Sequence, residues 1–133
     1  MTAMPKTLCV LSSVRTNNFD DPEIMAKISG AWQLAMAEPI EGAVYYGVYH
    51  HYASDFEGDY DLSVAVDIPG SSAEVLAVPE QPYVYYEVDA GNPQGVIEMW
   101  QHVWQQPLKR TYLFDYEEYF VDGRIRIAIG IEK

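Results

Sequence analysis

Two hydrophobic periods follow one another along the chain, in the same order in each half. A period of two marks residues 62 to 68, where apolar side chains alternate with polar or small ones. This alternation predicts a half-buried β-strand. A helical period, with apolar side chains every three or four residues, predicts two amphipathic helices. Their apolar positions are Ile24, Ile28, Ala31, Trp32 and Ala35 in the first helix, and Val96, Trp100, Val103 and Trp104 in the second.

The first half of the chain reads as strand, helix, strand and strand. The helix has a start signal, because Asp21 can cap its first turn and Pro22 suits its first position. Pro39 and Gly42 end the helix, since neither residue continues it well. The predicted strands of this half are residues 6–15, 43–52 and 60–68.

The second half repeats this order after a linker at residues 69–72. A tyrosine-rich strand comes first, and Asn92-Pro93 then starts a helix in the way that the Asp-Pro pair does in the first half. Asp122-Gly123 is a hairpin signal between the last two strands. The predicted elements are strand 82–88, a helix that Pro107 stops, and strands 110–120 and 125–131.

Matching side chains support an internal repeat. Trp32 and Trp104 fall on equivalent positions of the two predicted helices, and Tyr52 aligns with Tyr119. The strictly alternating strand at the end of one half aligns with the one at the end of the other. One helix on three strands is too small to bury much surface, so the two halves are expected to fold together.

We therefore expect one domain over residues 1–133, with half-repeats at about 5–70 and 78–133. The predicted fold class is α+β. Two pseudo-symmetric βαββ units form a curved antiparallel sheet, which carries two helices and a central ligand groove near the junction of the units.

Charge and composition exclude several classes of partner. The 133 residues are 49% hydrophobic, which suits a folded globular chain, and they carry a net charge of -12. This charge opposes direct nucleic-acid binding and docking on anionic lipid, and it attracts cations. No run approaches the length of a membrane span. The single cysteine, Cys9, is expected to be buried, and a chain without disulfides suits a reducing cytoplasm.

Acidic residues among aromatics mark the last third of the chain. Asp115, Glu117 and Glu118 stand in a segment that otherwise reads as a strand. A buried carboxylate is costly unless it is paired or hydrogen-bonded, so an inward acid would face something positive. The alternative is a solvated strand face over packed tyrosines. Alternation places Glu117 and Glu118 on opposite faces, but a slip of one residue exchanges them, so the period leaves both open.

The histidines do not form a metal motif. His50 and His51 are neighbours in a predicted strand, so we expect their side chains on opposite faces, and His102 lies on the second helix. The sequence has no glycine-rich phosphate loop, no serine nucleophile elbow and no Cys-His motif. We therefore expect no metal, no cofactor and no catalytic residue of these types.

A family resemblance rests on three segments: residues 46–55 with 58–60, residues 78–79 with 83–91, and Asp115-Tyr116-Glu117-Glu118-Tyr119. The last matches the pattern Asp-aromatic-Glu-any-Tyr. In this order the segments resemble the AraC-type effector-binding domain, also called the gyrase-inhibitor-like domain of the SOUL superfamily, over nearly the whole chain. The chain leaves no room for a helix-turn-helix segment, so it resembles the stand-alone branch, of which a similar version is known from mobile integron cassettes.

The resemblance implies a small-molecule sensor. In such domains a groove between two βαββ units holds lipophilic cations, with a glutamate for the charge and aromatic rings around the ligand. The matching glutamate is Glu117, which would face the ligand; the alternative is a core acid satisfied by neighbouring tyrosine hydroxyls. By the internal symmetry Tyr46 and His50 are expected on the opposite wall. The predicted ligand-binding residues are Glu117, Tyr46, His50, Tyr119, Trp104 and Trp32.

The expected function is non-catalytic binding of lipophilic, cationic, drug-like molecules by a stand-alone module of transcription-regulator type. A separate DNA-binding regulator is the implied protein partner. Some relatives hydrolyse strained electrophiles with an acid and a tyrosine, and Glu117 with Tyr119 offers that chemistry if burial raises the pKa of the glutamate. Gyrase-inhibitor relatives act on a protein target, and in that alternative the acidic surface would be the working part.

Overall fold

The structure is a computed structural model that describes residues 6–54, 57–79 and 81–132; Asp55 of the first resemblance segment lies outside them. Over the described residues the chain forms seven strands and two helices, in the predicted order except for one additional short strand, β4. The elements are β1 (Lys6–Thr16), α1 (Ile24–Ala35), β2 (Tyr45–His50), β3 (Tyr60–Val66), β4 (Val75–Val78), β5 (Tyr83–Val88), α2 (Gly95–Trp104), β6 (Arg110–Tyr119) and β7 (Ile125–Ile131).

Both helices begin later than their Asp-Pro and Asn-Pro signals predict, at Ile24 and Gly95. The side chains of Asp21 and Asn92 each accept the backbone N–H two residues further on, at 2.9 Å. This contact is an Asx turn. The two residues therefore stabilise the turn that leads into each helix, and the helix itself starts after that turn.

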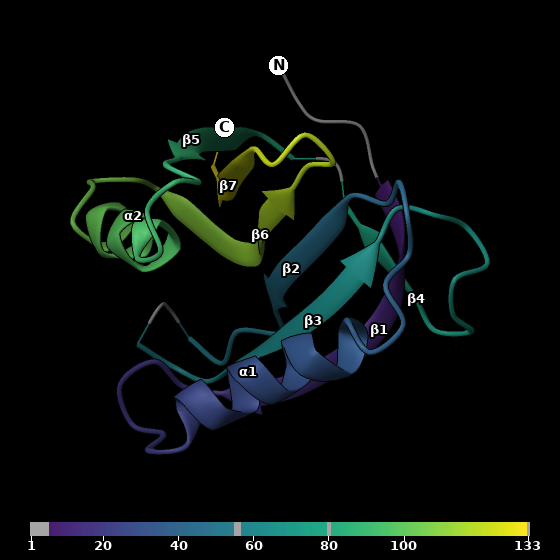
Figure 1. Cartoon of the computed structure of the whole chain (residues 1–133). Coiled ribbons are helices and arrows are strands. Elements are labelled where there is room, and N and C mark those ends of the chain that lie inside the picture. Colours follow the sequence, from purple (N-terminus) through teal and green to yellow (C-terminus); the bar gives the residue numbers. More distant parts are fainter. Residues whose placement is uncertain (1–5, 55–56, 80, 133) are drawn as a thin grey trace.

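The strands form one antiparallel sheet in the order β4-β1-β3-β2-β6-β7-β5. The two halves of the chain lie side by side and meet where β2 pairs with β6, as Figure 1 shows. In this pair Gly47 lies opposite Glu117, and Tyr45 lies opposite Tyr119. The predicted α+β fold, with a helix and an antiparallel set of strands in each half, is confirmed.

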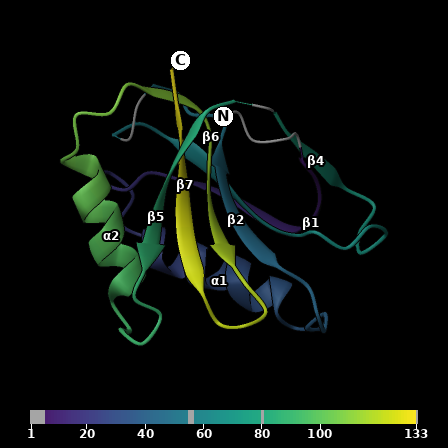
Figure 2. The same ribbon diagram turned by 90° about the horizontal axis from the view of Figure 1, so that it is seen from above.

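The sheet curls into half a barrel. Strands β4 and β5 lie at its opposite edges, yet only residues 79–82 join them. Such a connection spans at most about 18 Å, so the two edges must approach each other at this end. Seen from above, the strands fan out from that end (Figure 2).

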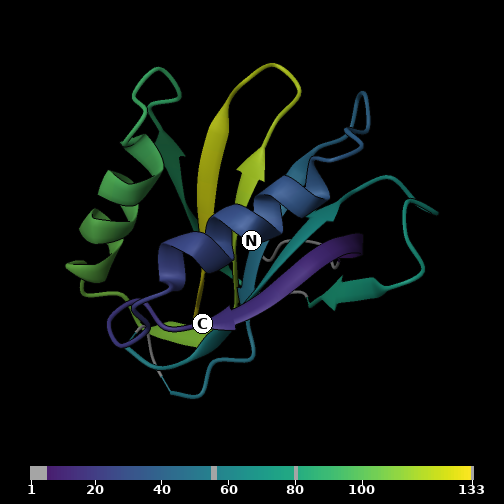
Figure 3. The same cartoon turned by 60° about the horizontal axis from the view of Figure 1, so that its bottom comes forward.

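Both helices pack on the same face of the sheet, which we term the helix face (Figure 3). Helix α1 lies over β1 and β3, and α2 lies beside β5. Ala31 and Ala35 of α1 are buried with Val64, whereas Val103 of α2 is buried with Ile127, so each helix has a core of its own. At 12 and 10 residues, neither helix of the described chain is long enough to cross a bilayer.

The opposite face, the back face, carries a third core to which every strand of the sheet contributes. Side chains of both edge strands join it, which agrees with a sheet that curls toward this side. The core therefore needs no helix to cover it. Among its members are Leu8, Val48, Ala65, Val78 and Ala128, with Tyr83 and Phe114 packed against them.

Candidate functional site

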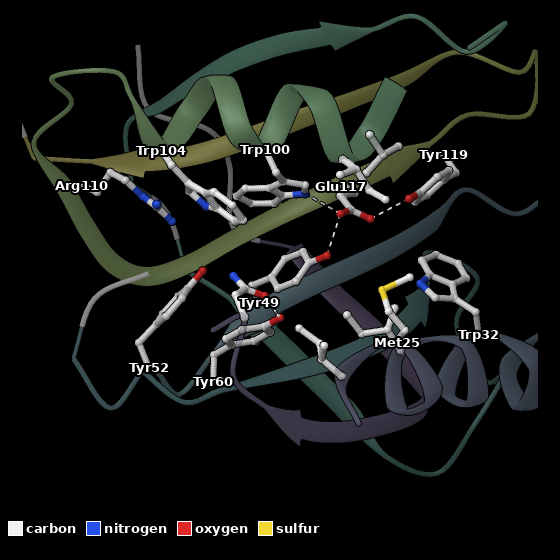
Figure 4. Close-up of a pocket in the computed structure, with 15 residues that line it drawn as sticks. Met25, Trp32, Tyr49, Tyr52, Tyr60, Trp100, Trp104, Arg110, Glu117 and Tyr119 are labelled. Atoms are coloured by element: carbon white, nitrogen blue, oxygen red, sulfur yellow. Dashed lines mark hydrogen bonds between the residues drawn. The ribbon is translucent and has the colours of Figure 1, made fainter. Parts of the chain in front are cut away.

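A cavity of about 370 Å³ lies between the two helices on the helix face. Ligand pockets occupy roughly 300–1,000 Å³, so the cavity suits a small organic molecule. Figure 4 shows α1 on one side, α2 on the other, and side chains of the sheet between them. All three tryptophans of the chain line this cavity. Its aromatic residues are Trp32, Tyr49, Tyr52, Tyr60, Trp100, Trp104 and Tyr119.

The carboxylate of Glu117 lies at the centre of the sheet side of this cavity, and the residue is 2% exposed. Its Oε2 accepts hydrogen bonds from the Tyr49 hydroxyl at 2.6 Å and from the Trp100 indole N–H at 2.7 Å. Its Oε1 accepts a hydrogen bond from the Tyr119 hydroxyl at 2.6 Å. Donors from β2, α2 and β6 thus fix the orientation of one carboxylate.

Burial raises the pKa of Glu117 above its ordinary range, and the hydrogen bonds from Tyr119, Tyr49 and Trp100 partly oppose this rise. Burial also raises the pKa of Tyr49 and of Tyr119, and the neighbouring carboxylate adds to both shifts. Both hydroxyls therefore keep their protons and continue to donate. The site holds a carboxylate that is costly to ionise and that a nearby cation would stabilise.

Three buried acids stand close together in β6, and they differ in their partners. Asp115 forms an ion pair with Arg110 at 2.7 Å, and Glu118 forms one with Arg126 at 2.6 Å. Within the described part of the chain, Glu117 forms no ion pair and has only the hydroxyl and indole donors. Glu118 lies on the back face. The acid that faces the cavity is therefore Glu117, which resolves the choice that the hydrophobic period left open.

Two tryptophan–tyrosine pairs flank the carboxylate. Trp32 of α1 packs edge-on against Tyr119, with ring centroids 5.0 Å apart. Trp100 of α2 packs in the same manner against Tyr49, also at 5.0 Å. In these ring contacts Trp100 is the counterpart of Trp32, and Tyr49 is the counterpart of Tyr119. Counted from the helix starts, Trp32 and Trp104 lie at equivalent positions within one residue, as predicted, so equivalent positions do not make equivalent contacts.

Gly47 of β2 makes room for these side chains. A Cβ atom at this position would lie 3.1 Å from Oε1 of Glu117 and 3.2 Å from the Trp32 ring. We expect Gly47→Ala to displace both side chains and to lower the free energy of unfolding by about 1–3 kcal/mol, as overpacking does. Urea denaturation measures this loss. The control is Gly30→Ala on α1, where a Cβ meets nothing within 4 Å; equal stability of Gly47→Ala and the wild type would contradict the steric role.

Four of the six predicted ligand-binding residues line the cavity, and two do not. Tyr46 and His50 belong to the back face, where Tyr46 packs on the Tyr116 ring at 5.7 Å and His50 Nε2 is 2.8 Å from the Ser63 hydroxyl. Their predicted place on the opposite wall is corrected, because Gly47, and not Tyr46, lies opposite the glutamate. The four lining residues are Glu117, Tyr119, Trp32 and Trp104.

The sequence prediction missed several residues of this cavity. The sequence could have predicted Trp100, because it shares the apolar face of its helix with Trp104. Tyr49 follows from alternation once Gly47 is placed on the helix face. The hydrophobic period gave no signal for Tyr52, because it lies beyond the end of β2, after a residue with φ of 53°, but its alignment with Tyr119 could have indicated it. The other missed aromatic and charged residues are Tyr60 and Arg110.

The same backbone irregularity brings His50 and His51 together. His51 has the φ of 53°, and the two rings lie 4.5 Å apart, so the expectation of opposite faces is wrong. With Asp61 they offer ligand atoms within 4.8 Å of one another. Asp61 contacts His51 at 2.6 Å and forms an ion pair with Arg15 at 3.1 Å. These contacts hold the group together without a metal ion. Burial lowers the pKa of His50 to about 4, which keeps the ring neutral. That no metal binds stays a prediction.

Fold and site together define an α+β protein with a curled seven-stranded sheet and an aromatic pocket around one buried carboxylate. It is similar to a solved structure from the mobile metagenome of Vibrio cholerae, the integron cassette protein VCH_CASS2. The TM-score is 0.81 and the sequence identity 28%, over 99% of this chain and 94% of the other. No family model and no curated protein matches the chain. The expected likeness to an integron-cassette protein is confirmed for the fold.

Proposed function

We propose that this chain is a stand-alone effector-binding module of the gyrase-inhibitor-like class, and that its pocket binds lipophilic cations without chemical turnover. The observation that carries this proposal is the buried carboxylate of Glu117, which has three donors but no ion pair within the described residues. The neighbouring buried acids of β6 both have an arginine. A buried charge without a counter-charge is unfavourable, and a cationic ligand would supply that charge.

Two attractions would hold such a ligand. Each aromatic ring attracts a cation by about 0.5–2 kcal/mol. A carboxylate about 4 Å away adds roughly 4 kcal/mol at an effective dielectric constant near 20. After the costs of association, dissociation constants of roughly micromolar order follow. Delocalised and quaternary cations should bind better than primary ammonium groups, because they lose less hydration when they enter the pocket.

The proposed class also suggests which kind of protein would respond to ligand binding. Domains that this chain resembles act within transcription regulators, so we propose that a separate DNA-binding protein in the cytoplasm senses the occupied pocket. The net charge of -12 supports this division of roles, because it opposes direct contact with DNA. The likeness to an integron cassette protein supports the stand-alone form.

The test is a fluorescence titration with matched ligands, because every tryptophan of the chain lines the cavity and reports on its contents. A diphenylmethane with a trimethylammoniomethyl group on one ring is compared with its neutral analogue, in which carbon replaces nitrogen. We expect the wild type to prefer the cation, and Glu117→Gln to weaken cation binding about tenfold to a hundredfold. Glu98→Gln, at an exposed position of α2, is the control for the lost charge. Equal binding by wild type and Glu117→Gln would rule the proposal out.

A hydrolase is the second candidate, and one feature of the site favours it. The hydroxyls of Tyr49 and Tyr119 both donate at 2.6 Å to Glu117, whose pKa burial raises. A carboxyl group with a raised pKa beside a tyrosine suits general acid–base work. Incubation with epoxide-bearing and other strained electrophiles, followed by chromatography, decides between the two functions. Turnover that Glu117→Gln abolishes without loss of affinity would favour the enzyme.

A further inference from the structure

Arg110 lies at the other end of the same cavity, and two nitrogens of its guanidinium lack hydrogen-bond partners among the described residues. It stands beside Trp104 and Tyr52, with Trp104 and Trp100 between it and Glu117 (Figure 4). Its side chain is only 5% exposed, and its Nη2 pairs with Asp115 at 2.7 Å. Nε and Nη1 are buried and have no hydrogen-bond partner among the described residues.

Among the described residues, the surroundings supply no acceptor for these two nitrogens. Oδ1 of Asp115 accepts the Gly130 N–H at 2.8 Å, and its Oδ2 is shared between Arg110 and the Tyr52 hydroxyl. The Tyr112 ring covers one face of the guanidinium, with its centroid 4.3 Å from Cζ, and a ring face accepts no strong hydrogen bond. An arginine guanidinium stays protonated in proteins, so both nitrogens keep their N–H groups. Buried donors of this kind are normally satisfied, so a missing acceptor points to a ligand.

We propose that this end of the cavity is an acceptor subsite, which takes a neutral oxygen acceptor, such as a ketone or amide carbonyl, from the ligand. The subsite rests on the proposed function, because the same ligand places its cationic group at Glu117. The ligand class is therefore a lipophilic aromatic cation with a carbonyl group on the side away from its positive charge.

A neutral acceptor fits this subsite better than a carboxylate does. Asp115 is 0% exposed and already balances the charge of Arg110. A further carboxylate would lie near Asp115, and it would add a second negative charge to a cavity that contains Glu117. A carbonyl oxygen satisfies the guanidinium N–H groups and adds no charge.

Three ligands with the same cationic group test the subsite by tryptophan fluorescence. The first is a diphenyl ketone with a trimethylammoniomethyl group on one ring, the second is its diphenylmethane analogue, and the third carries a carboxylate in place of the distal phenyl ring. We expect the ketone to bind the wild type about tenfold more tightly than the diphenylmethane, since a hydrogen bond to a charged donor is gained. We expect the carboxylate to bind no more tightly than the diphenylmethane.

The double variant Arg110→Met with Asp115→Asn removes both charges together and so leaves no unpaired ion. It should bind ketone and diphenylmethane equally, and circular dichroism checks that it is folded. If it does not fold, the ligand comparison on the wild type decides alone. Equal binding of ketone and diphenylmethane by the wild type would overturn the subsite and leave the proposed function standing. Tightest binding of the carboxylate would also overturn it, and failure of all three ligands would overturn both proposals.

Discussion

Asp115→Ala is expected to lower the free energy of unfolding by about 3–5 kcal/mol, because it breaks a buried ion pair by removing one partner. Asp115 is 0% exposed and binds three donors, namely Arg110, the Tyr52 hydroxyl and the Gly130 N–H. Its loss leaves a guanidinium buried without a counter-charge, and it leaves the hydroxyl and the N–H without their acceptor. Urea denaturation, followed by far-UV circular dichroism, measures the change.

The matched control is an ion pair of the same chemistry at the surface. Glu87 pairs with Arg124 at 2.7 Å, but both side chains are more than half exposed. Glu87→Ala should therefore cost less than about 1 kcal/mol. If Asp115→Ala costs no more than Glu87→Ala, the buried pair does not stabilise the fold in the way described. The double variant Arg110→Met with Asp115→Asn should recover part of the loss, because no charge is then left alone.

Local patterns in the sequence predicted most of the elements, because each element buries one face. Strand 125–131 was predicted with its observed bounds, since its isoleucines alternate without interruption. The inward faces of both helices were also predicted, including Trp32 and Trp100. Strand β4 was not predicted. It has only four residues, all of them apolar and two of them exposed, so it is too short to show an alternating pattern.

The errors at the site come from backbone irregularities that no hydrophobic period reveals. His51 and Tyr112 both have φ of 53°, a value that residues with side chains seldom adopt. The first ends β2 and turns Tyr52 toward the cavity, and the second lies within the irregular pairing of β6 with β7. The sequence also could not predict the register in which the two halves of the chain pair. It depends on how β2 pairs with β6, which is a contact between residues far apart in the sequence.

The two halves build a site that is symmetric in its rings and asymmetric in its charge. Each half supplies one tryptophan and one tyrosine, which meet across the junction of β2 and β6. At the strand position where one half has Glu117, the other has Gly47, which lies directly opposite. Two glutamates at this junction would repel each other in a space with room for one. A single carboxylate between two aromatic pairs is therefore what this repeat can accommodate.

Glu117→Gln is expected to raise the stability of the free protein at neutral pH while it weakens cation binding. The amide fits the existing hydrogen bonds. Its oxygen in the place of Oε2 still accepts from Tyr49 and Trp100, and its nitrogen in the place of Oε1 donates to the Tyr119 hydroxyl. The variant thus removes a buried charge, while the Tyr119 hydroxyl loses its acceptor and one amide N–H gains no partner among the described residues. We expect the removal of the charge to outweigh these losses. Glu118→Gln should have the opposite effect on stability, because it removes one partner of the ion pair with Arg126.

The sign of the pH dependence separates this explanation from a general effect of lost charge. The pKa of Glu117 is raised by burial above its unfolded value of about 4.3. Between these two pKa values the folded state binds more protons than the unfolded state, so the contribution of Glu117 to stability falls as the pH rises through this window. The stability advantage of Glu117→Gln over the wild type should therefore grow from acid to neutral pH and level off above the folded pKa. Over the same window the wild type should gain affinity for a quaternary ammonium ligand, and the variant should not. Urea denaturation and fluorescence titration at matched pH values measure the two trends, and a stability difference that is constant with pH would show that Glu117 is not an uncompensated buried acid.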